Sequence, residues 1–360
     1  MHSVLSYFKE YFNPRDGSPK WNHSAGWIAR NLHQVLSSYG DVSYLDSDDR
    51  PSKLKADLMI GHFWSFEQQC SGQDIDHKLV FYAAGNIDWT RQLLTGLASK
   101  YDVPFPDWDF PPGGFNNTRT LELADKILLI GNRCLVENFP KPVQHKIRLV
   151  NYSVRDGLFT HDQKDDQRSR EFCYVATHCD LRKGFMDVLK VWSDIFASEA
   201  VLHAVGAIRS PWDELLENHN NGSIHYHGWV ESSSPHYDQI LQRCKFAYIP
   251  TYSDAQMGTL LEVIYHGCLP ITTRESGLCD EVLAHCIVIN PRDIQQQRDV
   301  IREVLSWSHQ QWLERVNKVR VAASEYQSLQ RFQADIHSVI GESLDAGDGR
   351  FGRESCVTSL

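Results

Sequence analysis

The segment KFAYIPTYSDAQMGTLLEVIYHGCLPITT (residues 245–273) decides the fold class, because it contains a strand, a loop, a helix and a second strand in order. The apolar runs KFAYIP and LPITT have the length of buried strands. Between them, GTLLEVIYHG has helical character and ends at Gly267, a residue favoured just past the end of a helix. This order predicts a parallel sheet whose faces are covered by helices.

Similar apolar runs recur on both sides of this segment. In the second half they lie at 172–177, 201–206, 223–228 and 286–290, and a helical stripe joins Phe185, Val188, Leu189, Trp192, Ile195 and Phe196. In the first half they lie at 42–46, 57–61, 79–84, 126–130 and 147–150, with helical patterns at 24–38, 89–101 and 117–124. The expected fold is α/β, with two doubly wound Rossmann-like domains facing each other across a cleft.

The polar stretch RDGLFTHDQKDDQRSRE (155–171) has little to bury and is interpreted as the linker between the domains. The N-terminal domain is therefore expected over 1–155 and the C-terminal domain over 156–325. A further helix within 326–342 is expected to return to the N-terminal domain. Residues 343–360 lack periodicity and are expected to form a disordered tail.

Composition limits the classes of partner. The chain has 360 residues, 42% of them hydrophobic, and a net charge of −10. This charge argues against nucleic acid and leaves at most a peripheral membrane contact. Lys9 and Glu10 interrupt the apolar core that a secretion signal needs, so a cytoplasmic location is expected. The nine cysteines contain no C-x-x-C pair and are interpreted as reduced thiols.

The loop and helix that follow KFAYIP contain the first candidate site. Backbone N–H groups of Met257, Gly258 and Thr259 at the start of the helix are expected to bind an anion such as a phosphate. Glu262, one turn further on, is expected to accept hydrogen bonds from two hydroxyls such as those of a ribose. Asp254 would contact whatever lies beyond the phosphate. Alternatively, the two acids only stabilise the helix through its dipole.

A second loop, YVATHCDLRKGF (174–185), places Arg182, Lys183 and Gly184 after the first strand of the same domain. Two cations at the mouth of a parallel sheet, opposite a helix N-terminus, are expected to hold a diphosphate and stabilise the charge that develops on it. Arg and Lys before a helix are otherwise ordinary surface residues.

Together, the two loops resemble the GT-B glycosyltransferases, specifically the retaining family four, or glycosyl transferases group 1. That family has a Lys-Gly loop after the first strand of its C-terminal domain and an acid–seven residues–Glu motif at the donor site. Lys183-Gly184 matches the first, and Asp254 with Glu262 has the spacing of the second. HGWV (227–230) resembles the family's segment near the donor base.

The resemblance implies a role for each matched residue. Lys183 and Arg182 would bind the diphosphate of a nucleotide-sugar donor, and Glu262 the ribose. Asp254 would contact the transferred sugar. The residues implied in donor binding are Arg182, Lys183, Gly184, Met257, Gly258, Thr259 and Glu262, and those implied in catalysis are Asp254, Lys183 and Glu262.

Three positions depart from the family pattern. The first acid, usually Glu, is Asp254, which is one methylene shorter. The Arg that the family carries after the first strand falls on Thr177, so Arg182 would supply that charge. The usual Phe-Gly pair reads Gln256-Met257. These departures bear on the identity of the donor more than on the fold.

The N-terminal domain matches less well. The family commonly has a Gly-rich first loop and a His after a middle strand, whereas this chain has only Gly26 in the first region and Asn86 or Asp88 in the second. The aromatic loop 103–117 is interpreted either as a stacking wall for a sugar acceptor or as a plug for the sheet edge. Its DWD (107–109) mimics a metal-binding Asp-x-Asp, but it lies in the wrong domain, so no metal role is expected.

The resemblance implies a glycosyltransferase that moves a sugar from a nucleotide-diphosphate sugar to a hydroxyl of a carbohydrate or glycolipid-type acceptor, with retention of configuration. No cofactor or metal is expected if cations and amides hold the phosphates. Two alternatives remain open from the sequence. One is a sugar phosphorylase or epimerase that uses the same cleft, and the other is a catalytically silent GT-B subunit that binds a sugar or a partner.

Overall fold

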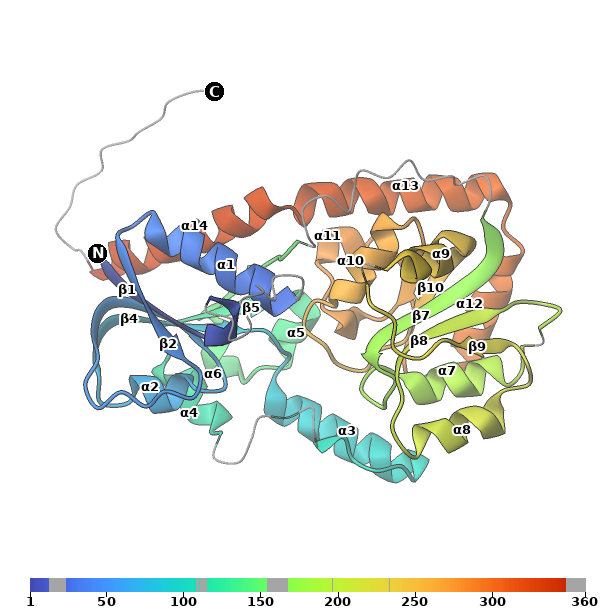
Figure 1. Ribbon diagram of the computed structural model, residues 1–360, viewed down its shortest axis with the longest axis horizontal. Coiled ribbons are helices and arrows are strands. Elements are labelled where there is room, and N and C mark those ends of the chain that lie inside the picture. The colour runs from blue at the N-terminus through green and yellow to red at the C-terminus, as the bar shows by residue number, and fades with distance from the viewer. Residues whose placement is uncertain are drawn as a thin grey trace.

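The computed structural model describes residues 1–12, 24–107, 110, 115–153, 168–195, 197–232 and 234–347. Two α/β domains lie next to each other along the long axis of the molecule (Figure 1). This arrangement confirms the predicted pair of doubly wound domains.

The N-terminal domain is a parallel sheet with strand order β2-β1-β3-β4-β5-β6 within the described residues. Its strands are β1 His2–Tyr7, β2 Asp41–Asp46, β3 Lys55–His62, β4 Asp74–Tyr82, β5 Lys126–Ile130 and β6 Ile147–Val150. Its helices are η1 Lys9–Tyr11, α1 Ser24–Ser37, α2 Phe66–Cys70, α3 Ile87–Tyr101, α4 Asn117–Leu123, α5 Arg133–Glu137 and α6 Lys141–Gln144. Leu58, Ile60, Leu79 and Phe81 are fully buried, and each contributes about 1.5–3 kcal/mol by leaving water.

The C-terminal domain repeats the plan with strand order β12-β11-β10-β7-β8-β9, all of whose described pairs are parallel. Its strands are β7 Ser169–His178, β8 Leu202–Ala207, β9 Ile224–Tyr226, β10 Cys244–Ile249, β11 Leu269–Thr272 and β12 Ile287–Val288. Its helices are α7 Phe185–Trp192, α8 Trp212–His219, α9 Pro235–Arg243, α10 Gly258–Tyr265, η5 Arg274–Ser276, α11 Asp280–Leu283, α12 Ile294–Leu305 and α13 His309–Tyr326.

The last helix, α14 Leu329–Gly347, lies on the N-terminal domain beside α1 (Figure 1). Phe332, Ile336, Val339 and Ile340 are buried there, in a core that also includes α1 and one face of the first sheet. The helix continues to Gly347, so the expected tail does not begin at residue 343. Residues 348–360 lie outside the described part of the chain.

Strand β1 was missing from the expected strands, although it pairs on both sides, with β2 and β3. Its sequence, HSVLSY, contains two serines that are fully buried. Ser6 donates a hydrogen bond to the Oε1 atom of Gln69, at 2.5 Å. These two polar residues break the apolar run that identified the other strands.

The segment around the expected linker also needs correction. Residues 154–167 lie outside the described residues, but the predicted linker's last three residues, 169–171, belong to β7. Just before them, Arg168 is buried and donates hydrogen bonds to the carbonyl oxygens of Leu241, at 2.9 Å, and Cys244, at 2.7 Å. The predicted apolar stripe of α7 also extends past the end of the helix at Trp192. Ile195 is buried beyond that end, and Phe196 lies outside the described residues.

Polar contacts join the two domains next to the cleft. Thr90 and Ser253 share a hydrogen bond of 2.7 Å between their hydroxyls. Tyr101 of α3 and Tyr252 of the C-terminal domain both donate to Oδ1 of Asp187, at 3.3 and 2.8 Å. Burial raises the pKa of Asp187 to about 6, and the hydrogen bonds from its partners oppose this rise. These contacts fix the position of one domain relative to the other beside the cleft.

Candidate active site

A cleft of about 850 Å³ lies between the carboxyl ends of the two sheets. The ends of β1 and β3 contribute Tyr7 and His62, and β7 and β8 contribute Thr177 and Val205. This volume is within the range of clefts that bind small molecules. Parallel α/β sheets place their ligands at this edge, so the cleft is the candidate active site.

The two loops singled out in the sequence meet in this cleft. Lys183 donates from Nζ to Oδ2 of Asp254, and Nη1 of Arg182 lies 3.6 Å from Oδ1 of the same carboxylate. The three side chains are only 12 to 23% exposed, so water screens their charges weakly. The two cations beside this carboxylate can also offer charge-assisted hydrogen bonds to an anionic ligand.

The backbone of the cation loop is fixed on the neighbouring loop. The carbonyl oxygen of Arg182 accepts hydrogen bonds from the Tyr252 amide, at 2.9 Å, and from the Thr251 hydroxyl, at 3.0 Å. Gly184 has a φ of 73°, and a Cβ there would collide with the Pro250 carbonyl oxygen. Gly184 does not line the cleft. It therefore positions Lys183 rather than contacting a ligand itself.

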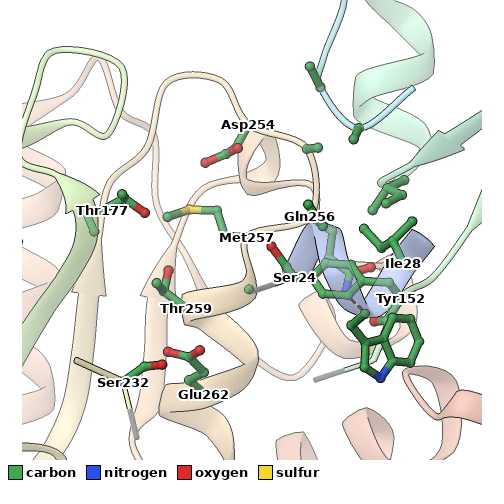
Figure 2. A pocket seen from close by; sticks show the side chains of 18 of the residues that line it. Ser24, Ile28, Tyr152, Thr177, Ser232, Asp254, Gln256, Met257, Thr259 and Glu262 are labelled. Atoms are coloured by element: carbon green, nitrogen blue, oxygen red, sulfur yellow. Dashed lines mark hydrogen bonds between the residues drawn. The ribbon is translucent and has the colours of Figure 1, made fainter. Parts of the chain in front are cut away.

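The first turn of α10 lines the C-terminal side of the cleft. Figure 2 shows Asp254, Thr259 and Glu262 projecting toward the same space from the loop and the helix. Gly258 packs so tightly against Tyr152 that a Cβ would collide with the Tyr152 hydroxyl. The amides of Gly258 and Thr259 lie in the first helical turn, where backbone N–H groups have no acceptor within the helix. The Thr259 hydroxyl is buried without a hydrogen-bond partner.

The expectation for the Met257 amide is wrong. This N–H donates to the Ser276 carbonyl oxygen at 3.2 Å, so it is not available to a ligand. The segment that contains Ser276 also fixes the backbone of Asp254, whose amide donates to the Glu275 carbonyl oxygen at 2.9 Å. Asn132 of the N-terminal domain in turn donates to the Leu278 carbonyl oxygen at 2.9 Å. Met257 lines the cleft through its side chain instead.

Glu262 lies in the same cleft, one turn into α10. Its Oε2 atom accepts a hydrogen bond of 2.7 Å from the hydroxyl of Tyr237, which α9 contributes. Tyr237 is buried, and burial raises its pKa, so it remains a donor. This hydrogen bond orients the carboxylate, whose two oxygens can each accept more than one hydrogen bond. Glu262 can therefore accept hydrogen bonds from ligand hydroxyls.

The wall contributed by the N-terminal domain is mainly aromatic and aliphatic. His62 sits on it among the rings of Tyr7, Phe8, Phe63 and Trp64. Burial lowers the pKa of His62 to about 3, so the imidazole is neutral. Its Nδ1 atom accepts from the Trp64 amide at 3.4 Å, which leaves the proton on Nε2. His62 is therefore a neutral hydrogen-bond donor.

Sequence reasoning missed His62. The usable signal was its position, directly after the apolar run DLMIG, at the carboxyl end of a strand. Asn86 and Asp88, which stood where the family has a His, do not line the cleft. Asn86 instead caps α3 by accepting from the Asp88 amide at 3.0 Å, and Asn117 donates to Asp88 at 2.7 Å.

The aromatic loop 103–117 does not line the cleft in its described residues. Phe105 and Phe110 stack on each other with ring centroids 5.1 Å apart, and Arg91 lies 4.4 Å over the ring of Phe110. The described part of this loop therefore does not form a stacking wall in the cleft. Of the DWD segment, Trp108 and Asp109 lie outside the described residues. Gly26, the glycine of the first loop region, is buried within α1.

Comparisons with known proteins agree with this architecture. Residues 169–306 match the sequence profile of the family described as Glycosyl transferases group 1. No curated protein sequence matches the chain. A solved sucrose-phosphate synthase (tll1590) from Thermosynechococcus elongatus is similar, with a TM-score of 0.65 and 13% identity over 96% of this chain and 100% of that chain.

Two further solved structures have the same fold. WaaG, a glycosyltransferase involved in lipopolysaccharide biosynthesis, has a TM-score of 0.57 and 14% identity over 94% of this chain and 99% of that chain. Anabaena Alr3699/HepE, in complex with UDP and glucose, has a TM-score of 0.57 and 9% identity over 96% of this chain and 99% of that chain.

These findings define the class. The two-domain architecture is the GT-B fold of glycosyltransferases. Within it, residues 169–306 match the Glycosyl transferases group 1 family. Among the described helices, none has both the length and the apolar character needed to cross a membrane.

Proposed function

We propose that this chain is a retaining glycosyltransferase of family four, which moves a sugar from a nucleotide-diphosphate sugar to a hydroxyl of a carbohydrate or glycolipid-type acceptor. One observation carries the proposal. Within the domain matched to Glycosyl transferases group 1, the Arg182–Lys183 pair, the first turn of α10 and Glu262 line a single cleft. The two cations suit the charge of a diphosphate, and the amides of the helix turn suit the diphosphate oxygens. Glu262 suits the hydroxyls of a ribose.

The donor is expected to lie along the C-terminal wall. Its diphosphate would contact Lys183, Arg182 and the amides of Gly258 and Thr259, because each offers positive charge or a free N–H group. The unpaired hydroxyl of Thr259 offers one further donor. Glu262 would accept from the ribose hydroxyls. The UDP in the similar HepE structure supports a nucleoside diphosphate in this kind of cleft.

The chemistry requires stabilisation of two opposite charges. As the bond between sugar and diphosphate breaks, negative charge grows on the departing phosphate and positive charge on the sugar ring. Lys183 and Arg182 would stabilise the first. Asp254, held by both cations, would face the sugar and stabilise the second. The low exposure of these three side chains strengthens each interaction.

The acceptor is expected against the N-terminal wall. Tyr7, Phe8, Phe63 and Trp64 suit the C–H faces of a sugar ring. His62 would donate a hydrogen bond from Nε2 to an acceptor oxygen. Of the described residues that line the cleft, the cations Arg182 and Lys183 both belong to the donor side. An uncharged acceptor ring therefore fits this wall.

A panel of nucleotide-diphosphate sugars, screened for a rise in melting temperature, tests the donor site, because a ligand that binds only the folded state stabilises it. The stabilising donor should then support transfer, with the product's anomeric configuration followed by NMR. Retained configuration is expected, and an inverted product would contradict the assignment to family four. Phosphate-dependent breakdown of a glycoside would indicate a phosphorylase. Lack of stabilisation by every nucleotide would indicate a silent subunit.

We also propose that transfer needs no metal in the cleft. Activity assayed well below the melting temperature is expected to survive a chelator, because the cations and amides would neutralise the diphosphate. Loss of activity that Mn²⁺ restores, with an unchanged melting temperature, would contradict this proposal.

A further inference from the structure

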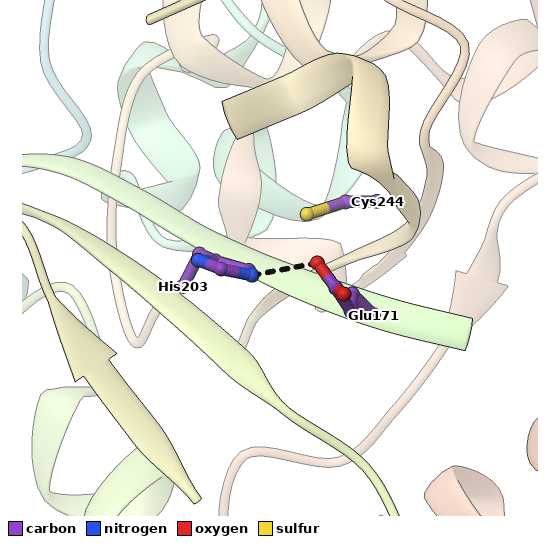
Figure 3. A group of neighbouring side chains, drawn as sticks. All are labelled: Glu171, His203 and Cys244. Carbon is purple, nitrogen blue, oxygen red and sulfur yellow. Dashed lines mark hydrogen bonds and ion pairs between the residues drawn. The ribbon is translucent and has the colours of Figure 1, made fainter. Parts of the chain in front are cut away.

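A second cluster of chemically active side chains lies on the C-terminal sheet. Glu171 of β7, His203 of β8 and Cys244 of β10 bring an oxygen, a nitrogen and a sulfur atom within 4.8 Å of one another (Figure 3). His203 and Cys244 are buried, and Glu171 is partly buried. His203 Nε2 lies 2.7 Å from Glu171 Oε2.

The three residues come from neighbouring strands and share one face of the sheet. Cys244 pairs in register with Glu171, and His203 pairs with Cys173, which is two residues beyond Glu171 on β7. All three are near the amino ends of their strands, whereas the cleft is formed at the carboxyl ends. The cluster is therefore separate from the candidate active site.

The donor atoms match the preferences of one kind of ion. Zinc binds cysteine sulfur, histidine nitrogen and carboxylate oxygen, usually as a tetrahedron. From its bond lengths, a tetrahedral zinc ion would separate such atoms by about 3.3–3.7 Å. Small side-chain rotations would widen the 2.7 Å contact between His203 and Glu171 and bring all three spacings, now within 4.8 Å, to that range. We propose that Glu171, His203 and Cys244 bind one Zn²⁺ ion that stabilises the C-terminal domain, with water in the fourth position.

Neighbouring groups orient two of the three ligands. The remaining nitrogen of His203, Nδ1, lies 2.9 Å from Nε2 of His227. Arg243 donates to both oxygens of Glu171, each at 3.1 Å. Hydrogen bonds of this kind to the outer side of metal ligands fix ring orientation and tautomer.

Histidines also connect the cluster to solvent. The ring of His227 lies against His203, with centroids 5.2 Å apart, and His236 lies 5.6 Å from His227 on its other side. His225 lies 5.4 Å from His203. His225 and His236 are exposed and His227 is partly exposed. An incoming ion would therefore meet imidazole nitrogens before it reaches the buried site.

The protonation states are compatible with binding. Burial lowers the pKa of His203, so its imidazole is neutral. Burial raises the pKa of Glu171, but hydrogen bonds from Arg243 and His203 outweigh it, so the carboxylate is ionised. Burial raises the pKa of Cys244, so its thiol keeps its proton without metal. Binding would shift the His203 proton from Nε2 to Nδ1 and release one proton from Cys244, forming the sulfur–zinc bond.

Metal titration of the purified full-length chain tests the site. After treatment with a chelator and its removal, Zn²⁺ should bind with a stoichiometry of one and raise the melting temperature. Co²⁺ in its place should give the near-ultraviolet absorption of a cobalt–thiolate bond. Cys244→Ser should abolish that absorption and weaken Zn²⁺ binding by more than about tenfold. Glu171→Gln provides a second variant and should also weaken binding.

Two controls separate this site from its alternatives. Cys286→Ser removes another buried thiol that, like Cys244, donates to a backbone carbonyl, at 3.5 Å. It should bind metal as the unmodified chain does. The double variant His225→Ala, His236→Ala should also retain the cobalt–thiolate absorption. Absence of Zn²⁺ binding by the unmodified chain, or an unchanged absorption in Cys244→Ser, would overturn the proposal. The cluster would then be a set of hydrogen-bonded side chains without a metal. Binding that depends on the surface histidines alone would overturn it too.

Discussion

The two walls of the cleft differ in chemical character. The C-terminal wall presents the cations Arg182 and Lys183, the carboxylates Glu231, Asp254 and Glu262, and the first turn of α10. The N-terminal wall presents aromatic and aliphatic side chains around one buried neutral imidazole, His62. Both walls are built from carboxyl ends of parallel strands. Equivalent positions in two similar sheets have therefore been used for different chemistry.

This difference in chemistry suits the two walls to different ligands, a nucleotide-sugar donor on one and an acceptor on the other. Charge is concentrated where a diphosphate would bind, because anions need cations and free amides. The aromatic wall offers stacking surface and the Nε2–H donor of His62, which suits an uncharged ring. Substitutions on the C-terminal wall should therefore change nucleotide binding or sugar transfer. Substitutions on the N-terminal wall should change the use of the acceptor alone.

The largest effect is expected from Asp254→Asn. It removes the carboxylate proposed to face the departing sugar, so turnover should fall by about 10²–10³-fold, the cost typical of losing one transition-state contact. Affinity for the bare nucleoside diphosphate should remain the same or tighten slightly, because Lys183 and Arg182 lose their counter-charge. Steady-state kinetics and calorimetric titration measure the two quantities. A large loss of nucleotide affinity would place Asp254 in nucleotide binding instead.

Lys183→Ala should weaken binding of both the donor and the bare nucleoside diphosphate by about 1.5–3 kcal/mol, or about 10- to 150-fold, because a charge-assisted contact is lost. Calorimetric titration measures the affinity. Lys245→Ala, in the same domain but outside the cleft, is the matched control and should bind nucleotide normally. If Lys183→Ala also binds normally, this lysine does not belong to the donor site.

Glu262→Gln should weaken the sugar donor and the bare nucleoside diphosphate equally, by about 1–2 kcal/mol, because the ribose is common to both and a charged acceptor is lost. The amide oxygen of Gln can still accept from Tyr237, so the melting temperature should change little. The measurement is a pair of titrations, one with each ligand. A loss confined to the sugar donor would move Glu262 from the ribose to the sugar.

The smallest effect is expected on the N-terminal wall. His62→Phe keeps a ring but loses the Nε2 donor, so acceptor kcat/KM should fall by about 2- to 10-fold, the value of one neutral hydrogen bond. Nucleotide affinity should not change. His62→Gln, which restores a donor, should recover part of the loss. Reduced nucleotide binding by His62→Phe would contradict the division of tasks between the walls.

Strands could be predicted from the sequence where their residues form continuous apolar runs. The run KFAYIP and its neighbours around 172–177 and 269–273 form adjacent strands β10, β7 and β11, because burial on both faces demands continuous apolar sequence. Strand β1 escaped detection, since the buried Ser3 and Ser6 interrupt its run. A side chain such as Gln69, distant in sequence, satisfies Ser6. Local patterns do not contain such partners.

The sequence likewise predicted only part of the candidate site. The spacing of Asp254 and Glu262 places both on one loop and helix, and the structure brings Lys183 and Arg182 to the same cleft. The Met257 amide was misjudged, because its acceptor, the Ser276 carbonyl, comes from another loop. His62 was missed for a related reason. A lone histidine after a strand becomes significant only when a second domain closes a cleft over it.

By itself, the sequence determined the alternation of strands and helices, the pairing of two such domains and the acid and cation loops of the C-terminal wall. These are encoded locally, by periodicity and by spacing along one segment. The tertiary structure alone decided which amides stay free, that His62 is neutral and faces the cleft, and that Glu171, His203 and Cys244 meet on three neighbouring strands. Hydrogen-bond partners, desolvation and side-chain proximity depend on residues far apart in sequence, and only chain folding brings these together.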